Sequence, residues 1–138
     1  MVTNKLCVSD KIRLATAIDT EGNIGIYPNK RKRWKTDIKR INFRPVVRVV
    51  NTHRGWLQLL KNIVGNGCLQ KPDKNGVSRI EWSCRNAERL LKQILPYLII
   101  KKKQAQIILA WYEEKPKKLY YNDAVKLLES LKERYMRC

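Results

Sequence analysis

The sequence predicts one α+β domain in which two helix–strand–strand units are followed by further helices. Segments with apolar residues at helical spacing alternate with pairs of short segments in which apolar and polar residues alternate. Turn-forming runs, among them Gly-Asn-Gly and Pro-Asp-Lys-Asn-Gly, separate these segments. A chain of 138 residues has room for one hydrophobic core. We therefore expect a single domain over residues 1–138, with its core at about 10–113 and a C-terminal helical extension at about 119–138.

The N-terminal third predicts a buried helix followed by two strands. Ser9 can cap a helix from Asp10 to Asp19, and small or apolar residues on both sides of this helix indicate that it is buried. Strands are expected from Asn23 to Tyr27 and near Phe43 to Val50, with a turn at Pro28-Asn29.

The remainder of the chain predicts a second unit of the same kind and then helices. Thr52 is a plausible cap for a second helix, which ends at Gly65-Asn66-Gly67. The later elements are a hairpin of Cys68–Lys71 and Val77–Ser83, helices at about Arg85–Leu95 and Lys101–Glu113, and an amphipathic helix from Asn122.

The charge of the chain indicates a polyanionic partner. Thirty Lys and Arg against 12 Asp and Glu give a formal net charge of +18. No apolar run approaches the ~20 residues that span a membrane, and the N-terminus has no apolar segment typical of a signal peptide. Residues 30–48 hold nine Lys or Arg and one acid. We therefore expect nucleic acid, and no membrane, as the partner.

The cysteines are scattered and indicate free thiols in a reducing compartment. Cys7, Cys68, Cys84 and Cys138 form no Cys-x-x-Cys pair, and His53 is the single histidine. A structural zinc site needs closely spaced ligands, which this pattern does not supply. The expected location is the cytoplasm of a prokaryote or an organelle matrix, and the protein is not expected to be secreted.

The run Leu14-Ala15-Thr16-Ala17-Ile18-Asp19-Thr20-Glu21-Gly22 is the most informative segment. It predicts a helix that ends in carboxylates beside a basic segment. Such a pairing suits phosphodiester chemistry if the carboxylates hold a metal and the bases hold phosphates. The alternative for Glu21 is a solvated acid, although an acid at a helix C-terminus opposes the helix dipole.

This run resembles the LAGLIDADG motif of homing endonucleases, and two further stretches resemble the same family. Together the three stretches cover roughly residues 10–113 in the family's αββαββα order. They are Leu14–Gly22, Val49–Thr52 with Trp56-Leu57 and Gly65–Gly67, and Leu95–Ala105. The sequence departs from the motif at Thr16, Ala17 and Thr20, and Glu21 stands where the family often has Asp, which keeps the carboxylate.

The resemblance implies a site-specific, metal-dependent double-strand DNA endonuclease encoded by a mobile intron or similar element. Glu21 and the backbone carbonyl of Thr20 would hold Mg²⁺ (or Mn²⁺). Lys101 matches the family's lysine near the scissile phosphate, and Lys102 or Lys103 is the alternative for that role.

Two more residues match the family's water network. Asn51 lies where the family carries Gln or Asn, with an ordinary turn or cap as the alternative. Arg54 matches a basic residue, with a phosphate contact as the alternative. His53 is expected to be a surface residue.

The same resemblance implies a four-stranded antiparallel saddle that lies in the DNA major groove, which carries the richer hydrogen-bond code. Strand alternation then buries Ile24 and Ile26 and turns Asn23, Gly25 and Tyr27 to DNA. It likewise exposes Arg44, Val46 and Arg48, buries Pro45, Val47 and Val49, and places Leu69, Ile80 and Trp82 inside. The predicted DNA-binding residues are Asn23, Tyr27, Asn29, Lys30, Lys32, Arg33, Arg44, Arg48, Gln70, Arg79 and Glu81.

The motif occurs once, so a second copy of the chain must supply the second carboxylate needed to cut a duplex. The sequence therefore predicts a homodimer on a long pseudo-palindromic target. Its interface is expected at Leu14, Ala15, Ile18 and Asp19. Two other functions stay open on the same scaffold: an RNA maturase that binds intron RNA, and a DNA-binding protein without catalysis.

Overall fold

The computed structural model describes residues 5–29, 42–114 and 121–136. Its elements begin with α1 (Val8–Glu21), β1 (Gly22–Asn29), β2 (Asn42–Asn51), α2 (Arg54–Val64), β3 (Cys68–Leu69), β4 (Ser78–Ser83) and α3 (Arg85–Ile94). A short 3₁₀ turn, η2 (Leu95–Tyr97), then leads to α4 (Lys102–Glu114) and α5 (Tyr121–Met136). The predicted αββαββα order with additional C-terminal helices is confirmed.

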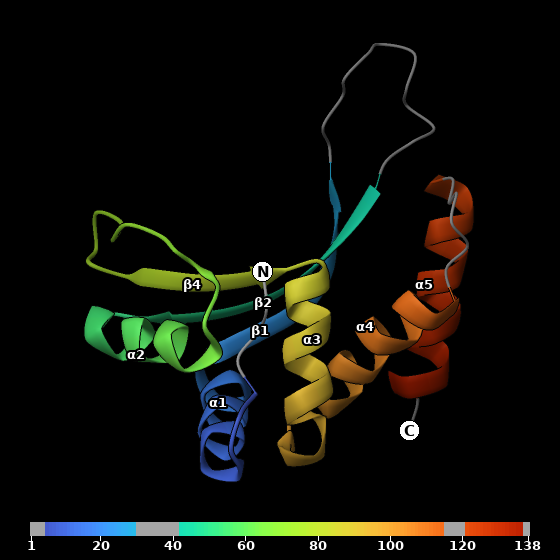
Figure 1. The fold of residues 1–138 in the computed structure, drawn as a ribbon. Helices are drawn as coiled ribbons and strands as arrows, with labels where there is room; N and C mark the ends of the chain where they lie inside the picture. Colours follow the sequence, from blue (N-terminus) through green and yellow to red (C-terminus); the bar gives the residue numbers. More distant parts are fainter. Residues whose placement is uncertain (1–4, 30–41, 115–120, 137–138) are drawn as a thin grey trace.

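The strands form one four-stranded antiparallel sheet in the order β1-β2-β4-β3. The long pair β1 and β2 curves across the molecule, and the labelled helices α1, α2, α3 and α4 lie on one side of the sheet (Figure 1). Arg48 on β2 stands between Asn23 on β1 and Glu81 on β4. This register places polar side chains of three strands on the face away from the helices.

The core fills the space between the sheet and α1, α2 and α3. The largest fully buried side chains there come from every one of these elements and include Leu14, Ile18, Leu57, Leu60, Ile80, Trp82, Leu90 and Leu91. Trp82 also donates its indole N–H to the carbonyl of Asn66 at 3.0 Å, which ties β4 to the turn after α2. Burial of these apolar groups positions the ends of α1 and β2 next to each other.

The helix α1 begins earlier than its sequence suggests. It starts at Val8 with Cys7 as its N-cap, so Ser9 lies inside the helix and does not cap it. The glycine at its other end is required by close approach, because a Cβ on Gly22 would lie 2.7 Å from the Ile18 carbonyl and 2.9 Å from that of Arg48. Gly22 thus lets the chain pass directly from α1 into β1.

Three more local expectations are corrected. Pro28 and Asn29 continue β1, paired with Phe43 and Asn42, where a turn was expected. The cap of α2 is His53, whose Nδ1 accepts a hydrogen bond from the backbone N–H of Trp56 at 3.0 Å; it is not Thr52. The strand β3 is only two residues long.

Val46, expected on the exposed face, is buried. Its neighbour on β1 is Gly25, over which the ring of Tyr27 folds, since a Cβ on Gly25 would lie 2.9 Å from that ring. Of the other positions predicted to lie inside, Ile24, Pro45, Val47, Val49, Ile80 and Trp82 are buried, whereas Ile26 and Leu69 are only partly buried.

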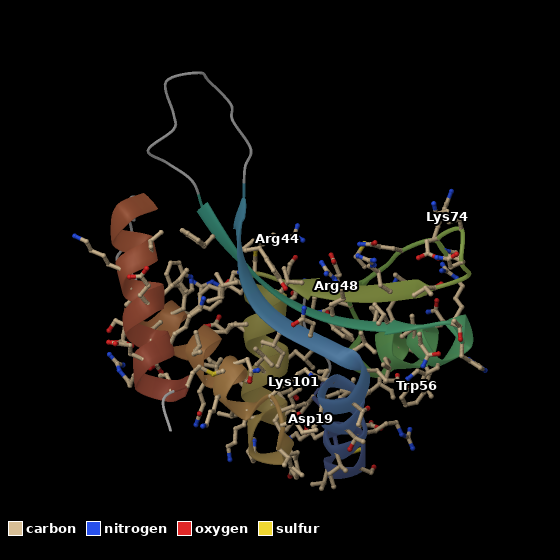
Figure 2. The ribbon with its side chains drawn as sticks, turned by 180° about the vertical axis from the view of Figure 1, so that it is seen from behind. Asp19, Arg44, Arg48, Trp56, Lys74 and Lys101 are labelled. Atoms are coloured by element: carbon tan, nitrogen blue, oxygen red, sulfur yellow. The ribbon has the colours of Figure 1, made fainter. Side chains whose placement is uncertain are left out.

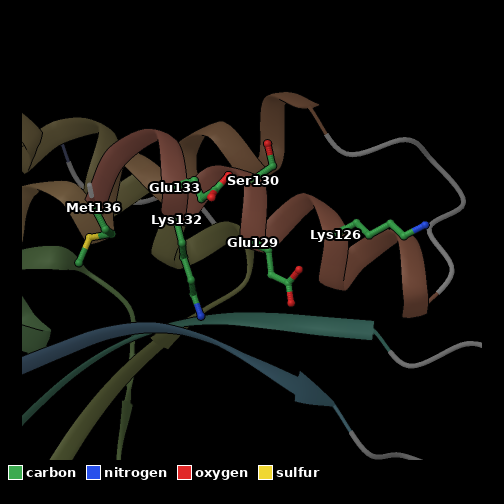
Figure 3. Close-up of a pocket in the computed structure, with 6 residues that line it drawn as sticks. All are labelled: Lys126, Glu129, Ser130, Lys132, Glu133 and Met136. Atoms are coloured by element: carbon green, nitrogen blue, oxygen red, sulfur yellow. The ribbon is translucent and has the colours of Figure 1, made fainter. Parts of the chain in front are cut away.

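The C-terminal helices form a second apolar cluster. Trp111 of α4 packs with Leu128 and Leu131 of α5, and Phe43 of β2 meets the Trp111 ring edge-on at 5.8 Å between centroids. The outer side of α5 borders an open hollow of about 720 Å³, with Lys126, Glu129, Lys132 and Glu133 among its lining residues (Figure 3). Among the predicted site residues that the structure describes, none lines this hollow.

Candidate active site and nucleic-acid interface

Glu21 and Asn51 meet where α1 and β2 end. Glu21 is the last residue of α1 and is exposed, and Asn51 is the last residue of β2. The amide Nδ2 of Asn51 donates to Glu21 Oε2 at 3.0 Å, while its Oδ1 accepts from the backbone N–H of His53 at 2.8 Å. The amide is therefore fixed at both ends, and it holds one carboxylate oxygen in place.

Asp19 has a different part from the one expected of it. Its carboxylate is buried and accepts three backbone hydrogen bonds, from Ile99 at 2.8 Å, Ile100 at 3.1 Å and Lys101 at 2.9 Å. These bonds fasten the loop before α4 to the end of α1. The carboxylate is thus engaged within its own chain, where a contact between paired helices was expected.

Lys101 lies at the same end of α1. Its Nζ donates to the backbone carbonyl of Asp19 at 2.7 Å, and Figure 2 shows the two residues side by side. A cation beside the last carbonyls of a helix interacts favourably with the helix dipole. Glu21 and Lys101, 80 positions apart in the chain, are brought to one helix terminus.

Arg54 does not join this group by any direct contact in the described ranges. Its Nη1 donates to the carbonyl of Gln70 at 2.7 Å and to Ser78 Oγ at 3.2 Å. Arg54 therefore links the start of α2 to the strands β3 and β4. Its expected place in a water network remains a prediction.

Three of the residues expected at a dimer interface are buried within the single chain. Leu14, Ala15 and Ile18 have no exposed surface in the single chain, because this side of α1 faces its own core. The exposed side of α1 carries Ile12, Thr16 and Thr20, four residues apart, so they form one stripe.

A shallow groove of about 390 Å³ follows the exposed side of α1. Residues of α1 line it from Ser9 to Glu21, and Trp56 of α2 closes it on one side. Thr20 Oγ1 donates back to the Thr16 carbonyl at 2.8 Å, so its polar atom is satisfied within the helix. The groove thus leads along α1 to the candidate catalytic carboxylate.

The outer face of the sheet carries the predicted DNA-binding side chains of three strands. Asn23 and Tyr27 are exposed on β1 and share a hydrogen bond of 3.1 Å. Arg44 and Arg48 lie on β2 (Figure 2), with Arg79 and Glu81 on β4. Gln70 follows β3 and pairs its backbone N–H with the Arg79 carbonyl at 2.8 Å. The side chain of Asn29 and the residues Lys30, Lys32 and Arg33 lie outside the described part.

The acids available near Glu21 are few. Within residues 5–29, 42–114 and 121–136 no group of three or more His, Cys, Asp or Glu side chains is placed to hold a metal. At this point the described residues offer the exposed carboxylate of Glu21 and the backbone carbonyl of Thr20. Magnesium fits such a sparse oxygen set, because it keeps several waters and uses one or two carboxylates plus phosphate oxygens.

The structure also bears on the cysteines and on the lengths of the helices. The three cysteines that are described, Cys7, Cys68 and Cys84, are free and exposed. Among the described helices none is both long and apolar enough to cross a lipid bilayer.

Comparison with solved structures identifies the fold. Homing endonuclease I-CvuI, solved with its DNA target in the presence of calcium, superposes with a TM-score of 0.70 at 18% identity, over 91% of this chain and 98% of that one. The archaeal intron-encoded homing endonuclease I-Vdi141I, complexed with DNA, gives 0.56 at 12% identity, over 89% and 96%. I-LtrWI, a LAGLIDADG homing endonuclease bound to target DNA, gives 0.61 at 15%, over 91% of this chain and 44% of that one.

The chain therefore has the fold of the LAGLIDADG homing endonucleases, and it spans nearly the whole length of I-CvuI. No family model and no curated protein sequence matches it.

Proposed function

We propose that this protein is a site-specific double-strand DNA endonuclease that works as a homodimer. The observation that carries the proposal is the grouping of Glu21, Asn51 and Lys101 at one end of α1. None of the three is needed there by the core, since Glu21 is exposed and Asn51 and Lys101 are only partly buried. A hydrolytic site explains why they meet.

The residues divide the chemistry between them. Glu21, through the oxygen that Asn51 does not occupy, and the Thr20 carbonyl would hold Mg²⁺ (or Mn²⁺), which neutralises phosphate charge and lowers the pKa of a bound water. Asn51 orients the carboxylate. Lys101 supplies a positive charge that stabilises the attacked phosphate, and its side chain is flexible enough to bring Nζ to that phosphate.

A second copy of the chain is proposed to pack on the exposed side of α1. The stripe of Ile12, Thr16 and Thr20 offers an apolar group and short side chains, which allow two helices to approach closely. A two-fold axis between two α1 helices would bring two Glu21 carboxylates together. It would also align two sheets along one duplex, so that the target would be approximately palindromic.

Oligomeric state tests the dimer directly. Sedimentation equilibrium of the full chain is expected to give a dimer, and Ile12→Lys is expected to give a monomer, because it places a charge in the interface. Leu59 on α2 is an apolar residue of similar exposure, so Leu59→Lys is the matched control and should remain dimeric. A wild-type monomer, free and bound to DNA, would contradict the proposed assembly.

Cleavage tests the activity. Incubated in Mg²⁺ with plasmids carrying randomised inserts, the protein is expected to linearise a small subset, and sequencing of the new ends should give a near-palindromic consensus. EDTA should abolish the reaction. Intact plasmids throughout, together with tight binding to structured RNA, would favour the maturase instead.

A further inference from the structure

Glu81 is an acid in the middle of the basic sheet face, and it is already occupied by two arginines. Its carboxylate Oε1 accepts from Arg48 Nε at 2.7 Å and lies 2.5 Å from Arg48 Nη2, and Oε2 lies 3.5 Å from Arg44 Nη2. Only 11% of the Glu81 side chain is exposed, against 43% for Arg44 and 28% for Arg48. The carboxylate is therefore mostly covered, while the guanidinium groups reach solvent.

The strand register makes this arrangement rigid. Arg48 and Glu81 are directly opposite each other on β2 and β4, and Arg44 lies four residues earlier on the same face of β2. Both strands are anchored on their other face, because the adjacent Val47, Val49 and Ile80 are fully buried. The ion pair thus stands on a backbone that the core holds still.

The contacts leave one edge of Arg48 for a ligand. An arginine has five N–H donors, and Glu81 takes the edge made by Nε and Nη2. One N–H of Nη1 and the second N–H of Nη2 are parallel to each other at the end of the guanidinium. A pair of parallel N–H donors of this kind matches the O6 and N7 acceptors of guanine in the major groove.

We propose that Glu81 is a positioning residue that aims Arg48, and secondarily Arg44, at guanines of the target, so that it raises sequence discrimination while it weakens binding overall. This rests on the proposed DNA-binding function of the sheet. An acid facing DNA repels the phosphates and lowers the overall affinity, but Glu81 also fixes the orientation of Arg48 and so favours one sequence over others. Glu81 itself does not read a base, which differs from its expected role as a direct DNA contact.

The experiment uses the full chain and a duplex library with a random central segment. Repeated selection with the wild type defines a consensus, in which we expect a guanine at one position of each half-site that depends on Arg48. Binding of the selected duplex and of single-position variants is then measured for the wild type, Glu81→Gln and Glu81→Asp. Glu113→Gln, an exposed acid on α4, is the charge-matched control.

Glu81→Gln is expected to lose roughly 10-fold in discrimination at the guanine position, which is the size of a good bidentate contact. Its binding to unrelated duplex should tighten several-fold, because one negative charge near the phosphates is gone. Glu81→Asp keeps the charge but shortens the side chain, so it should lose discrimination without the gain in unspecific binding. The control, Glu113→Gln, should change neither the discrimination at the guanine position nor the affinity for unrelated duplex.

The outcomes distinguish a failure of the DNA-reading function from a failure of the role proposed for Glu81. If the wild type selects no sequence at all, the DNA-reading function fails. If the wild type selects a sequence but Glu81→Gln and Glu81→Asp select it with equal stringency, only the role of Glu81 is overturned. Arg48→Lys, which keeps the charge and loses the fork, provides a check that does not alter Glu81: it should relax the same position.

Discussion

The contact of Asp19 with the loop before α4 gives a sharp prediction for Asp19→Asn. The carboxylate accepts from Ile100 and Lys101 through Oδ1 and from Ile99 through Oδ2. An asparagine keeps one oxygen, which can serve two of these donors. Its NH₂ group must then face the remaining N–H, so at least one hydrogen bond is replaced by a donor–donor clash.

The expected cost follows from these bonds. A hydrogen bond to a charged group contributes about 1.5–3 kcal/mol, and a buried donor left unpaired costs about as much. Ile99 and Ile100 are themselves exposed, so water takes over part of the loss. We therefore expect the free energy of unfolding to fall by about 2 kcal/mol. Cleavage should fall as well, because Lys101 is held by the same loop.

Urea denaturation measures this change as a lower midpoint at an unchanged slope. The matched control is Asp10→Asn in the first turn of the same helix, where only the interaction with the helix dipole is lost, at most about 1 kcal/mol. If both variants are destabilised equally, the three backbone hydrogen bonds do not anchor the loop, and the account of how Lys101 is positioned is wrong.

Three other predictions concern charge. Binding to the selected duplex should weaken with rising salt with a log–log slope of about −5 to −9, as expected for roughly 6–10 phosphate contacts, and a flat dependence would mean that the net charge of +18 serves another purpose. Arg44→Ala should relax base preference at particular target positions by about 1–3 kcal/mol. Lys74 lies in the exposed turn between β3 and β4 (Figure 2), so Lys74→Ala should lower the affinity for all duplexes alike. Identical selected sequences for wild type and Arg44→Ala would contradict this. Burial raises the pKa of Tyr112 to about 12, although the Arg85 guanidinium, 4.5 Å from the ring centroid, favours the phenolate. The stabilisation that comes from the neutral tyrosine should therefore be complete below pH 10 and lost between pH 10 and about 12. Unfolding measurements on the wild type and Tyr112→Phe across this pH range will test the prediction.

Most of the fold could be predicted because it rests on periodicity. The alternation in β2 and β4 gave the buried Val47, Val49, Ile80 and Trp82. It failed at Val46, which is buried although alternation alone exposes it; its cross-strand neighbour is Gly25, over which the ring of Tyr27 folds. Such covering depends on the cross-strand register, which no local pattern contains.

The candidate site was predictable in its members but less so in their contacts. Glu21, Asn51 and Lys101 do gather at one helix end. The three backbone hydrogen bonds to Asp19 join segments about 80 residues apart in the chain, and no local spacing pattern predicts them. The exposed side of α1 was also hard to predict, because this helix buries the more apolar of its sides, with Leu14, Ala15 and Ile18, and exposes the less apolar one.

The catalytic role of Glu21 is tested most directly by measuring binding and cleavage of the same selected duplex in Mg²⁺ for the wild type and Glu21→Gln. The exchange keeps the size of the side chain and its hydrogen bond partners but removes the charge needed to hold a cation. We predict that Glu21→Gln binds the duplex with nearly wild-type affinity and cuts neither strand. A variant that folds, binds and still cuts at the wild-type rate would contradict the assignment of the active site to this end of α1.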